Sequence, residues 1–163
     1  MSTAPRTNSS LEFQLNRAVA SLFRERASGR KVTYAELLSD KMLIIAAIRI
    51  GIPYSLFELI LKYTPFSETD WASFLNISTK SLQRYEQNRR YHFKPLQSEK
   101  IIELAEVTRL GLDVFGNMEK FRLWLDAPNY ALGNMKPVEL LRDSYGKEMV
   151  VAELNRINYG ILS

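Results

Sequence analysis

Positively charged side chains are concentrated in one short segment of the 163-residue chain, between Ser78 and Lys94. The segment contains five basic residues and one acidic residue, whereas residues 95–163 contain eight basic and ten acidic residues. Clustered lysine and arginine side chains neutralise the phosphate charge of nucleic acids. The segment is therefore a candidate phosphate-binding surface, and a solvated basic face without a partner is the alternative. Its basic residues are Lys80, Arg84, Arg89, Arg90 and Lys94.

Residues suited to catalysis are scarce. The chain has no cysteine and a single histidine, His92, so the side chains that usually form metal sites and catalytic triads are almost absent. His92 lies between two aromatic residues, which favours a structural role at or near the surface. Carboxylate pairs such as Glu103 and Glu106 fall on one helix face, where solvation is the usual reason for them, and no phosphate-binding loop or dinucleotide fingerprint is present. The sequence therefore predicts a protein that is not an enzyme and needs no cofactor and no metal.

The basic segment begins inside a pattern typical of a helix-turn-helix. Residues 68–86 read as two short helices separated by a three-residue turn. Asn76 occupies a turn position that favours a positive φ, which Gly adopts most easily and Asn next. Ile77, Leu82 and Tyr85 are placed to pack inward. In this motif the start of the second helix reads base edges in the major groove, and flanking groups hold phosphates.

Eight residues of this segment are candidate DNA contacts. Those at the start of the second helix, and one turn later, would reach base edges, and the basic residues after it would neutralise phosphates. A helical hairpin with a solvated basic face is the alternative. The first group is Ser78, Thr79, Lys80, Gln83 and Arg84, and the second is Arg89, Arg90 and Lys94.

The elements that would position these residues are all helical. Apolar residues recur with helical spacing along the chain, and no strand or hairpin pattern is present, so the predicted fold class is all-α. Polar and glycine residues mark the expected helix ends. Thr33, Asp40 (or Ser39), Ser67 with Asp70, and Ser98 are expected to cap helix starts, and Gly51, Gly116 and Gly146 are expected to follow helix ends.

The stretch from Trp124 to Leu141, WLDAPNYALGNMKPVELL, interrupts the helical pattern. Pro128 restricts the residue before it to an extended backbone, and Pro137 can restart a helix at its first position. Gly133 and Asn134 permit a sharp reversal between them. The predicted loop is therefore stiff, and a stiff loop loses less conformational entropy on binding. A simple connector is the alternative.

Five segments, taken in order, resemble the Xre/MbcA/ParS-type antitoxins. They are GIPYSLFELI, ISTKSLQRYEQNRR, EKIIELAEVTRLGLDVFG, WLDAPNYALGNMKPVELL and YGKEMVVAELNRINYGI, and the similarity runs from about Leu43 to Ser163. Asn134 replaces the second Gly of the family's ALGG motif, and Asn76 replaces the usual Gly of the helix-turn-helix turn. Asn holds a left-handed backbone at modest cost, so neither replacement conflicts with the fold.

The resemblance implies a protein of two parts. The fold would be an Xre-like helix-turn-helix bundle followed by a small helical toxin-binding domain. The C-terminal part would bind and inhibit a toxin, typically a RES-domain enzyme that consumes NAD, and the helix-turn-helix part would bind and repress the promoter of its own operon. Because helix-turn-helix modules normally read two half-sites, a homodimer inside a larger hetero-oligomer is expected.

Two groups of residues are candidate toxin contacts. The loop supplies large amphipathic side chains and turn residues, although Trp124 and Leu132 could equally belong to the core. The end of the chain is expected to pack into the toxin with the terminal carboxylate near its active-site mouth; the alternative is that Ile161 and Leu162 cover this protein's own core. The loop group is Trp124, Pro128, Asn129, Tyr130, Leu132, Gly133 and Asn134, and the C-terminal group is Tyr159, Gly160, Ile161, Leu162 and Ser163.

The expected domain boundaries follow from these motifs. Residues 1–40 would form an N-terminal helical extension, 41–97 the Xre-like DNA-binding region and 98–163 the toxin-binding domain. The longest apolar run and the start of the chain suit neither a membrane span nor a signal peptide, so a cytoplasmic location is expected. A stand-alone transcription factor whose C-terminal helices only dimerise, and a helical scaffold without a nucleic-acid role, are the alternatives.

Overall fold

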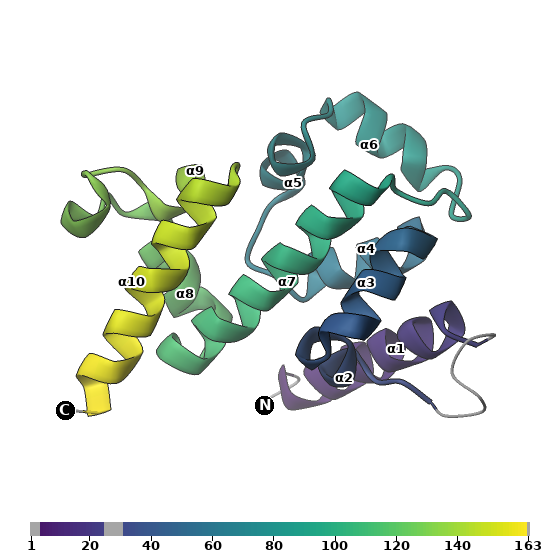
Figure 1. Ribbon diagram of the computed structural model, residues 1–163, viewed down its shortest axis with the longest axis horizontal. Coiled ribbons are helices and arrows are strands. Elements are labelled where there is room, and N and C mark those ends of the chain that lie inside the picture. The colour runs from purple at the N-terminus through teal and green to yellow at the C-terminus, as the bar shows by residue number, and fades with distance from the viewer. Residues whose placement is uncertain (1–3, 25–30, 163) are drawn as a thin grey trace. The chain divides into compact units, whose positions relative to one another are not determined.

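The computed structural model describes residues 4–24 and 31–162, with side chains for residues 10–24 and 31–160. Within these ranges the chain is all-α and has no strand (Figure 1), which confirms the predicted fold class. Its helices are α1 (Ala4–Leu22), α2 (Tyr34–Ser39), α3 (Lys41–Ile50), α4 (Tyr54–Lys62), α5 (Glu68–Leu75), α6 (Thr79–Glu86), α7 (Pro95–Phe115), α8 (Met118–Asp126), the 3-10 helix η1 (Tyr130–Leu132), α9 (Pro137–Leu140) and α10 (Ser144–Leu162).

The helices form two compact units. The N-terminal unit contains Met1–Tyr63 and Lys80–Ile102, and the C-terminal unit contains Thr64–Thr79 and Glu103–Ser163. Helix α7 begins in the first unit and ends in the second, and the helix-turn-helix segment is likewise divided between them. The domain boundaries expected from the sequence stay predictions.

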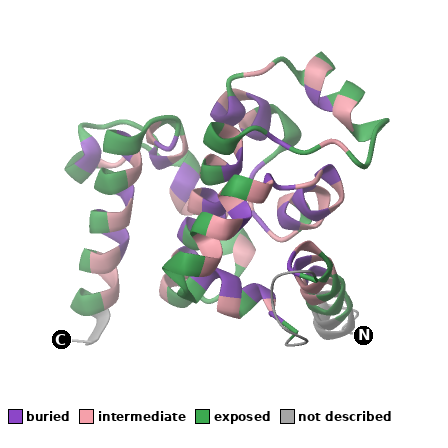
Figure 2. Ribbon diagram, turned by 45° about the vertical axis from the view of Figure 1, so that its right-hand side comes forward, coloured by how far each residue is buried: buried purple, intermediate pink, exposed green. Residues whose placement is uncertain are grey.

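The core of the N-terminal unit lies between α1, α2 and α4. Helix α1 packs on both of the others, and its Leu15 and Val19, which the helical pattern places on one stripe, are fully buried. Phe57 and Ile60 of α4 are buried as well (Figure 2). Burial of such large side chains stabilises the unit by about 1.5 to 3 kcal/mol each. Helix α1 is thus part of this core, although it lies in the predicted N-terminal extension.

The core of the C-terminal unit is built around aromatic side chains. Trp71 of α5 is fully buried and donates its indole N–H to Thr64 Oγ1 at 3.3 Å. Phe121 of α8 is also fully buried, and Gly111 of α7 allows its close approach, because a Cβ at this glycine would lie 2.2 Å from the Phe121 ring. Val150 of α10 adds a further fully buried side chain. The small Gly111 thus makes room for the large Phe121 ring where α7 meets α8.

Several predicted helix ends are confirmed. The Thr33 hydroxyl accepts the Glu36 backbone N–H at the start of α2, and the Asp40 carboxylate accepts two backbone N–H groups at the start of α3. Ser67 and Asp70 form a complete capping box at the start of α5. Gly51 and Gly116 follow α3 and α7 with φ values of 89° and 84°.

The predicted capping role of Ser98 is wrong. Helix α7 begins at Pro95, and Ser98 lies inside it, fully buried. Its hydroxyl donates to the Phe93 carbonyl oxygen at 3.1 Å and accepts the Ile52 backbone N–H at 2.9 Å. Pro95 at the first helical position is itself a signal for a helix start, and the sequence analysis instead placed the start at Ser98, three residues later. The serine instead joins two distant parts of the N-terminal unit.

The predicted role of Gly146 is also wrong. It does not end a helix but lies in the first turn of α10, buried against the end of α9. A Cβ at this position would lie 1.9 Å from the Leu140 carbonyl oxygen, so only glycine fits. Its backbone N–H is bound by the Asp143 carboxylate at 2.7 Å. Close packing of two helices, rather than a positive φ, is the physical reason for this glycine.

Candidate DNA-binding and toxin-binding surfaces

The turn before α6 has the backbone conformation that the sequence predicts. Asn76 follows α5 in the left-handed region, with φ 56° and ψ 45°, and its N–H is bound by carbonyl groups at the end of α5. The Ile77 N–H is bound by the Ala72 carbonyl at 3.0 Å. Helix α6 then begins at Thr79, so that three residues connect it to the end of α5. The short connection fixes which residues occupy the first turn of α6.

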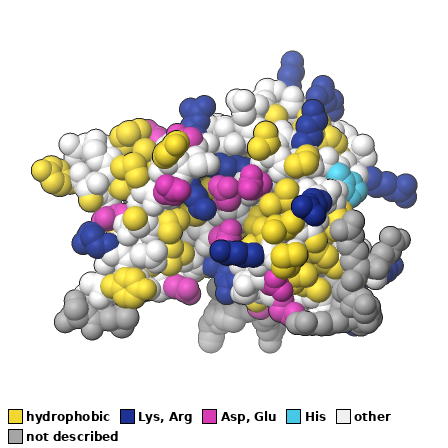
Figure 3. All heavy atoms as spheres, in the orientation of Figure 1, with side chains coloured by type: hydrophobic (Ala, Val, Ile, Leu, Met, Phe, Trp, Pro, Cys, Tyr) yellow, Lys and Arg dark blue, Asp and Glu magenta, His cyan; other side chains and the backbone are white. Residues whose placement is uncertain are grey.

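All eight predicted DNA contacts have exposed side chains: Ser78, Thr79, Lys80, Gln83, Arg84, Arg89, Arg90 and Lys94. The dark-blue lysine and arginine side chains in Figure 3 project where Figure 1 places α6. By contrast Leu82 is buried, and it anchors the opposite face of the helix. A helix with one anchored face and one polar, basic face is suited to enter a DNA groove.

An aromatic cluster supports α6 from below. The ring of Tyr85 stacks on that of Tyr91, with centroids 3.8 Å apart, and both rings meet Phe93 edge-on. Burial, together with the hydrogen bond between Tyr91 and Tyr85, raises the pKa of Tyr91 to about 12. Tyr91 therefore stays neutral at physiological pH and adds no negative charge beside the predicted phosphate contacts, whereas the same hydrogen bond lowers the pKa of Tyr85.

Two of the basic residues have their orientation restricted. The guanidinium of Arg84 lies over the ring of Tyr85, 5.7 Å from its centroid, which is within the range of a cation–π contact. Arg89 forms an ion pair with Glu58 of α4, which also lies 3.9 Å from the Lys62 ammonium. Arg84 is thus presented by the helix itself, whereas Arg89 is tied to the core of the N-terminal unit.

The loop between α8 and α9 is held by its own backbone. Ala127, before Pro128, is extended with φ −96° and ψ 135°, as predicted. Asn129 and Met135 form an isolated bridge, with the Asn129 N–H donating to the Met135 carbonyl at 3.0 Å. Gly133 and Asn134 both have positive φ, 70° and 64°, which confirms the predicted reversal.

Asn129 organises this loop through both its backbone and its side chain. Its side-chain oxygen accepts the Ala131 N–H at 2.9 Å, and its carbonyl accepts the N–H groups of Leu132 and Asn134 at 3.0 and 2.9 Å. Its side chain is half-buried rather than projecting freely. The structure therefore gives Asn129 a positioning role within the loop.

The predicted toxin contacts of the loop divide into anchors and exposed groups. Leu132 is buried, and Trp124 is half-buried against Phe115 and Phe121, at centroid distances of 5.6 and 6.3 Å. Tyr130, in contrast, is 91% exposed. Pro128, Gly133 and Asn134 are exposed as well. Leu132 and Trp124 fix the loop, and Tyr130 is its largest protruding side chain.

The predicted C-terminal contacts continue α10. Tyr159 is 71% exposed, and Gly160 is exposed within the helix, which continues to Leu162. The side chains of Ile161 and Leu162, and all of Ser163, lie outside the described residues. The prediction that these three residues pack into a toxin therefore stays a prediction.

An ion cluster holds α8 in place. Arg122 donates to Asp126 at 2.7 Å, to Asp70 at 2.6 Å and to the Pro65 carbonyl at 2.9 Å. Partial burial opposes ionisation of Asp70, but the hydrogen bonds from Arg122 and from the Ser67 backbone outweigh it and lower the pKa of Asp70. Although burial acts in the opposite direction, hydrogen bonds to Asp126 and Asp70 raise the pKa of Arg122. The cluster thus joins α8 to the capping box of α5.

Four further exposed apolar side chains of the C-terminal unit were missed by the sequence analysis. Leu123, Met135, Tyr145 and Met149 are 68%, 44%, 83% and 46% exposed. Single exposed apolar residues are common, so their types alone give no signal. The signal available was positional, because Leu123 and Met149 interrupt the polar face that helical periodicity predicts.

Metal and membrane features are absent from the parts of the chain that the structure describes. No group of three His, Asp or Glu side chains in residues 4–24 and 31–162 is arranged to hold a metal ion. None of the described helices combines the length and the apolar character needed to cross a membrane. His92 is exposed, and its Nδ1 lies 2.7 Å from the Arg90 carbonyl oxygen.

Comparison with protein families finds two matches along the chain. The antitoxin Xre-like helix-turn-helix domain matches residues 43–106, and the antitoxin Xre/MbcA/ParS C-terminal toxin-binding domain matches residues 110–160. A search of curated proteins finds no match. The two matched regions cover well over half of the chain and define a two-part antitoxin.

The chain belongs to the Xre/MbcA/ParS-type antitoxins of toxin–antitoxin systems, as its motifs predicted. Both matched families are antitoxin families and neither is enzymatic, in agreement with the prediction that the protein is not an enzyme. The two domains indicate a toxin and DNA as its partners. The α6 surface lies in the first match, and the loop with Tyr130 lies in the second.

Proposed function

We propose that the protein neutralises a RES-domain toxin that consumes NAD and represses its own operon by binding the promoter. The observation that carries the proposal is the loop at residues 124–141. It lies within the match to the toxin-binding domain, its backbone is fixed by internal hydrogen bonds, and it presents Tyr130 with 91% of its surface exposed. The RES identity of the toxin follows from the family resemblance.

The loop is suited to dock against a protein because it combines an exposed aromatic residue with a fixed backbone. Large aromatic side chains often carry most of the binding energy of an interface. Pre-organisation reduces the entropy lost when the loop binds. Pro128, Gly133 and Asn134 lie on either side of Tyr130 in the sequence of the loop, and Tyr159 and Gly160 of α10 belong to the same proposed interface. Inhibition by the last residues of the chain is part of the proposal.

The α6 surface is suited to DNA because its exposed side chains include both readers and phosphate binders. Lys80 and Arg84 can donate to guanine acceptors in the major groove, and Gln83 can pair with adenine. Arg89, Arg90 and Lys94 would neutralise phosphates. Binding as a homodimer would place two such helices on the half-sites of an operator.

Co-expression tests the toxin assignment. The gene for a neighbouring RES-domain protein is expressed with and without this chain, and growth and cellular NAD are measured. The toxin alone should arrest growth and deplete NAD, and this chain should restore both. Persistent NAD depletion despite a folded, co-expressed chain would contradict inhibition of that toxin.

Binding to the upstream DNA of the operon tests the repressor assignment. The wild-type protein should bind this fragment more tightly than an unrelated fragment of equal length. The double variant Lys80→Ala, Arg84→Ala should lose this preference while still neutralising the toxin. Retained DNA preference without any toxin neutralisation would instead identify a stand-alone transcription factor.

A further inference from the structure

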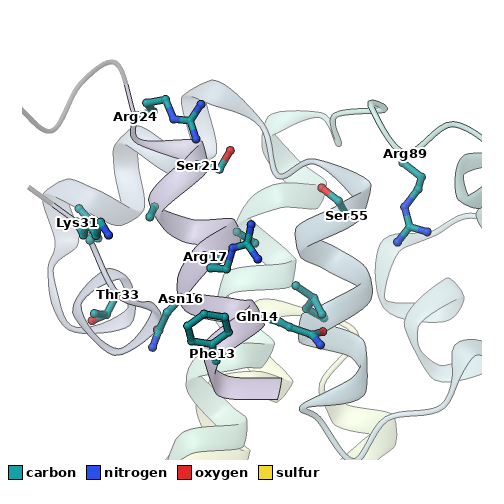
Figure 4. A pocket seen from close by; sticks show the side chains of 14 residues that line it. Phe13, Gln14, Asn16, Arg17, Ser21, Arg24, Lys31, Thr33, Ser55 and Arg89 are labelled. Carbon is teal, nitrogen blue, oxygen red and sulfur yellow. The ribbon is translucent and has the colours of Figure 1, made fainter. Parts of the chain in front are cut away.

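A surface groove opens in the N-terminal unit between α1, the segment before α2, and α4 (Figure 4). It has a volume of about 930 Å³, and Arg89 borders it from the segment that follows α6. Figure 4 shows Arg17 pointing from the middle of α1 toward the side where Ser55 and Arg89 lie, with Arg24 near the end of the same helix. Most of the groove lies outside the residues matched by either antitoxin family.

Among the residues that the structure describes, the groove is lined by four positively charged residues and no acidic one. The cations are Arg17, Arg24, Lys31 and Arg89. Arg17, Arg24 and Lys31 are exposed, and none of them forms an ion pair with a residue that the structure describes. Arg89 is paired with Glu58, which lies outside the lining. Three of the four lining cations are therefore without an ion-pair partner among the described residues.

The types of these side chains favour phosphate as the ligand. Arginine presents a planar fork of donors that matches a phosphate group, and lysine binds phosphate as a point charge. The groove is open and its cations are exposed, which is suited to an extended polyanion that remains partly solvated rather than to a small enclosed ligand. Ser21, Thr33 and Ser55 add hydroxyl groups along its walls.

The groove and most of α6 belong to the same compact unit. Lys80–Ile102, which contains α6 from its second residue onward, clusters with Met1–Tyr63. Arg89 belongs to both sets, because it is one of the predicted phosphate contacts after α6 and also lines the groove. The positive charge after α6 is therefore continued by α1 and by Lys31.

We infer that the groove is a second phosphate-binding site that holds the DNA backbone beside the segment read by α6. The inference rests on the proposed DNA binding and adds a role for the N-terminal extension. The extension would contribute affinity for any DNA sequence, since phosphates carry no sequence information. A free phosphorylated small molecule shares the same chemistry and is the competing occupant.

A pair of matched variants tests this inference. The groove variant Arg17→Gln, Lys31→Gln removes two charges from the lining. The control Lys41→Gln, Arg49→Gln removes one lysine and one arginine from exposed positions of α3 that do not line the groove. Binding to a long duplex that contains the operon's upstream sequence, and to an unrelated duplex of equal length, is measured over a salt series. Sedimentation establishes that both variants keep the wild-type oligomeric state.

The groove variant should make the slope of log K against log salt less steep by about 1 to 2, and should weaken binding about 10-fold or more at 0.1 M salt. The loss should be equal on both duplexes, and the control should keep the wild-type slope. Equal slopes for the groove variant and the control would overturn the inference while leaving the proposed DNA binding intact. Failure of the wild-type protein to bind the upstream duplex would instead refute the proposed DNA binding on which the inference rests.

Calorimetry with ADP and with tripolyphosphate distinguishes the competing occupant. Neither should bind saturably to the wild-type protein at 0.1 M salt. Saturable binding of ADP that the groove variant loses, with no change in the DNA slope, would overturn the assignment to DNA and give the groove to a free phosphorylated ligand.

Discussion

Charged and polar side chains cover the outer face of α6, whereas an aromatic side chain protrudes from the loop at residues 124–141. The two surfaces also differ in what holds them. Leu82 and the Tyr85–Tyr91 stack fix α6 through side-chain packing, while Asn129 and its backbone partners fix the loop through hydrogen bonds. A surface that recognises a polyanion must place positive charges opposite the phosphates. A surface that binds through one protruding aromatic side chain must instead hold the backbone of that residue in a fixed position.

The largest expected effect is a loss of stability when the contact between α9 and α10, next to the loop, is disrupted. Gly146→Ala places a methyl group against the Leu140 backbone carbonyl, which no side-chain rotation can relieve. The substitution should destabilise the protein by about 3 kcal/mol or more, at the upper end for overpacking. Denaturant unfolding of the variant and the wild type measures the difference. Gly160→Ala is the control, because a Cβ there meets nothing within 4 Å.

The second largest effect is expected when the protruding aromatic side chain is removed, because this should weaken toxin binding and leave DNA binding unchanged. Tyr130→Ala should weaken toxin binding by about 2 kcal/mol or more, roughly 30-fold, as expected for a central aromatic contact. DNA binding should not change. Tyr145→Ala, which removes an exposed tyrosine from α10, is the matched control for residue type. Equal toxin affinity for the folded Tyr130 variant and the wild type would reduce the loop to a connector.

Salt should affect the two surfaces unequally. If Arg89, Arg90 and Lys94 each neutralise one phosphate, raising salt from 50 to 200 mM should weaken DNA binding about 40-fold per protomer. Toxin binding through an aromatic contact should change far less over the same range. Parallel titrations by one method measure both. Similar salt dependence of the two affinities would mean that the toxin interface is also mainly electrostatic.

The same contrast explains which features the sequence could predict. Local signals were sufficient where a residue and its close neighbours in the sequence determine the backbone conformation. Examples are the left-handed Asn76 and Asn134, the extended Ala127 and the capping box of Ser67. They failed at Ser98 and Gly146, whose roles depend on distant or neighbouring elements: the Ile52 N–H in one case and the Leu140 carbonyl in the other. No residue type or spacing encodes such a contact before the chain is folded.

The candidate sites follow the same rule. The exposed face of α6 could be predicted because helical periodicity assigns inward and outward positions. In the loop, periodicity gives no such assignment, so the division between buried Leu132, half-buried Trp124 and exposed Tyr130 required the structure. The cationic groove was not predicted, since Arg17 and Arg89 are far apart in the chain and line one groove only in the folded unit.

Backbone strain in the loop should have a smaller effect than loss of Tyr130. Gly133→Ala forces an L-residue to keep φ at 70°, which costs about 1 to 2 kcal/mol, with no steric clash because a Cβ there meets nothing within 4 Å. Gly116→Ala is matched to it, with φ at 84° and equally open surroundings at the end of α7. Both variants should lose similar stability in denaturant unfolding. Only Gly133→Ala should also weaken toxin binding, and an equal loss of toxin affinity in both would mean that the loop conformation has no special importance.

Acid should weaken the ion cluster of Arg122, Asp70 and Asp126, which joins the two matched domains within the C-terminal unit, and this effect is expected to be the smallest. Asp70 caps α5, in the helix-turn-helix match, and pairs with Arg122 of α8, in the toxin-binding match. Its pKa in the folded protein is below the ordinary value of 3.8, because hydrogen bonds from Arg122 and Ser67 outweigh the cost of burial. The ionised form is therefore favoured by folding. Its contribution is fully present above about pH 4 and is lost as the pH falls through the lower pKa of the folded state.

The pair is partly exposed to solvent, so its contribution should be about 1 kcal/mol or less. Thermal unfolding of the wild type and of Arg122→Gln, measured from pH 6 down to pH 3, isolates it. The variant should be less stable at pH 6, and the difference between the two proteins should shrink as the pH falls. Asp126→Asn is the control, because it removes the more exposed partner of Arg122 and leaves the capping box of α5 intact. A stability difference that stays constant from pH 6 to pH 3 would show that Arg122 acts through packing and its bond to the Pro65 carbonyl, and that the charge of Asp70 contributes nothing to holding α8 against α5.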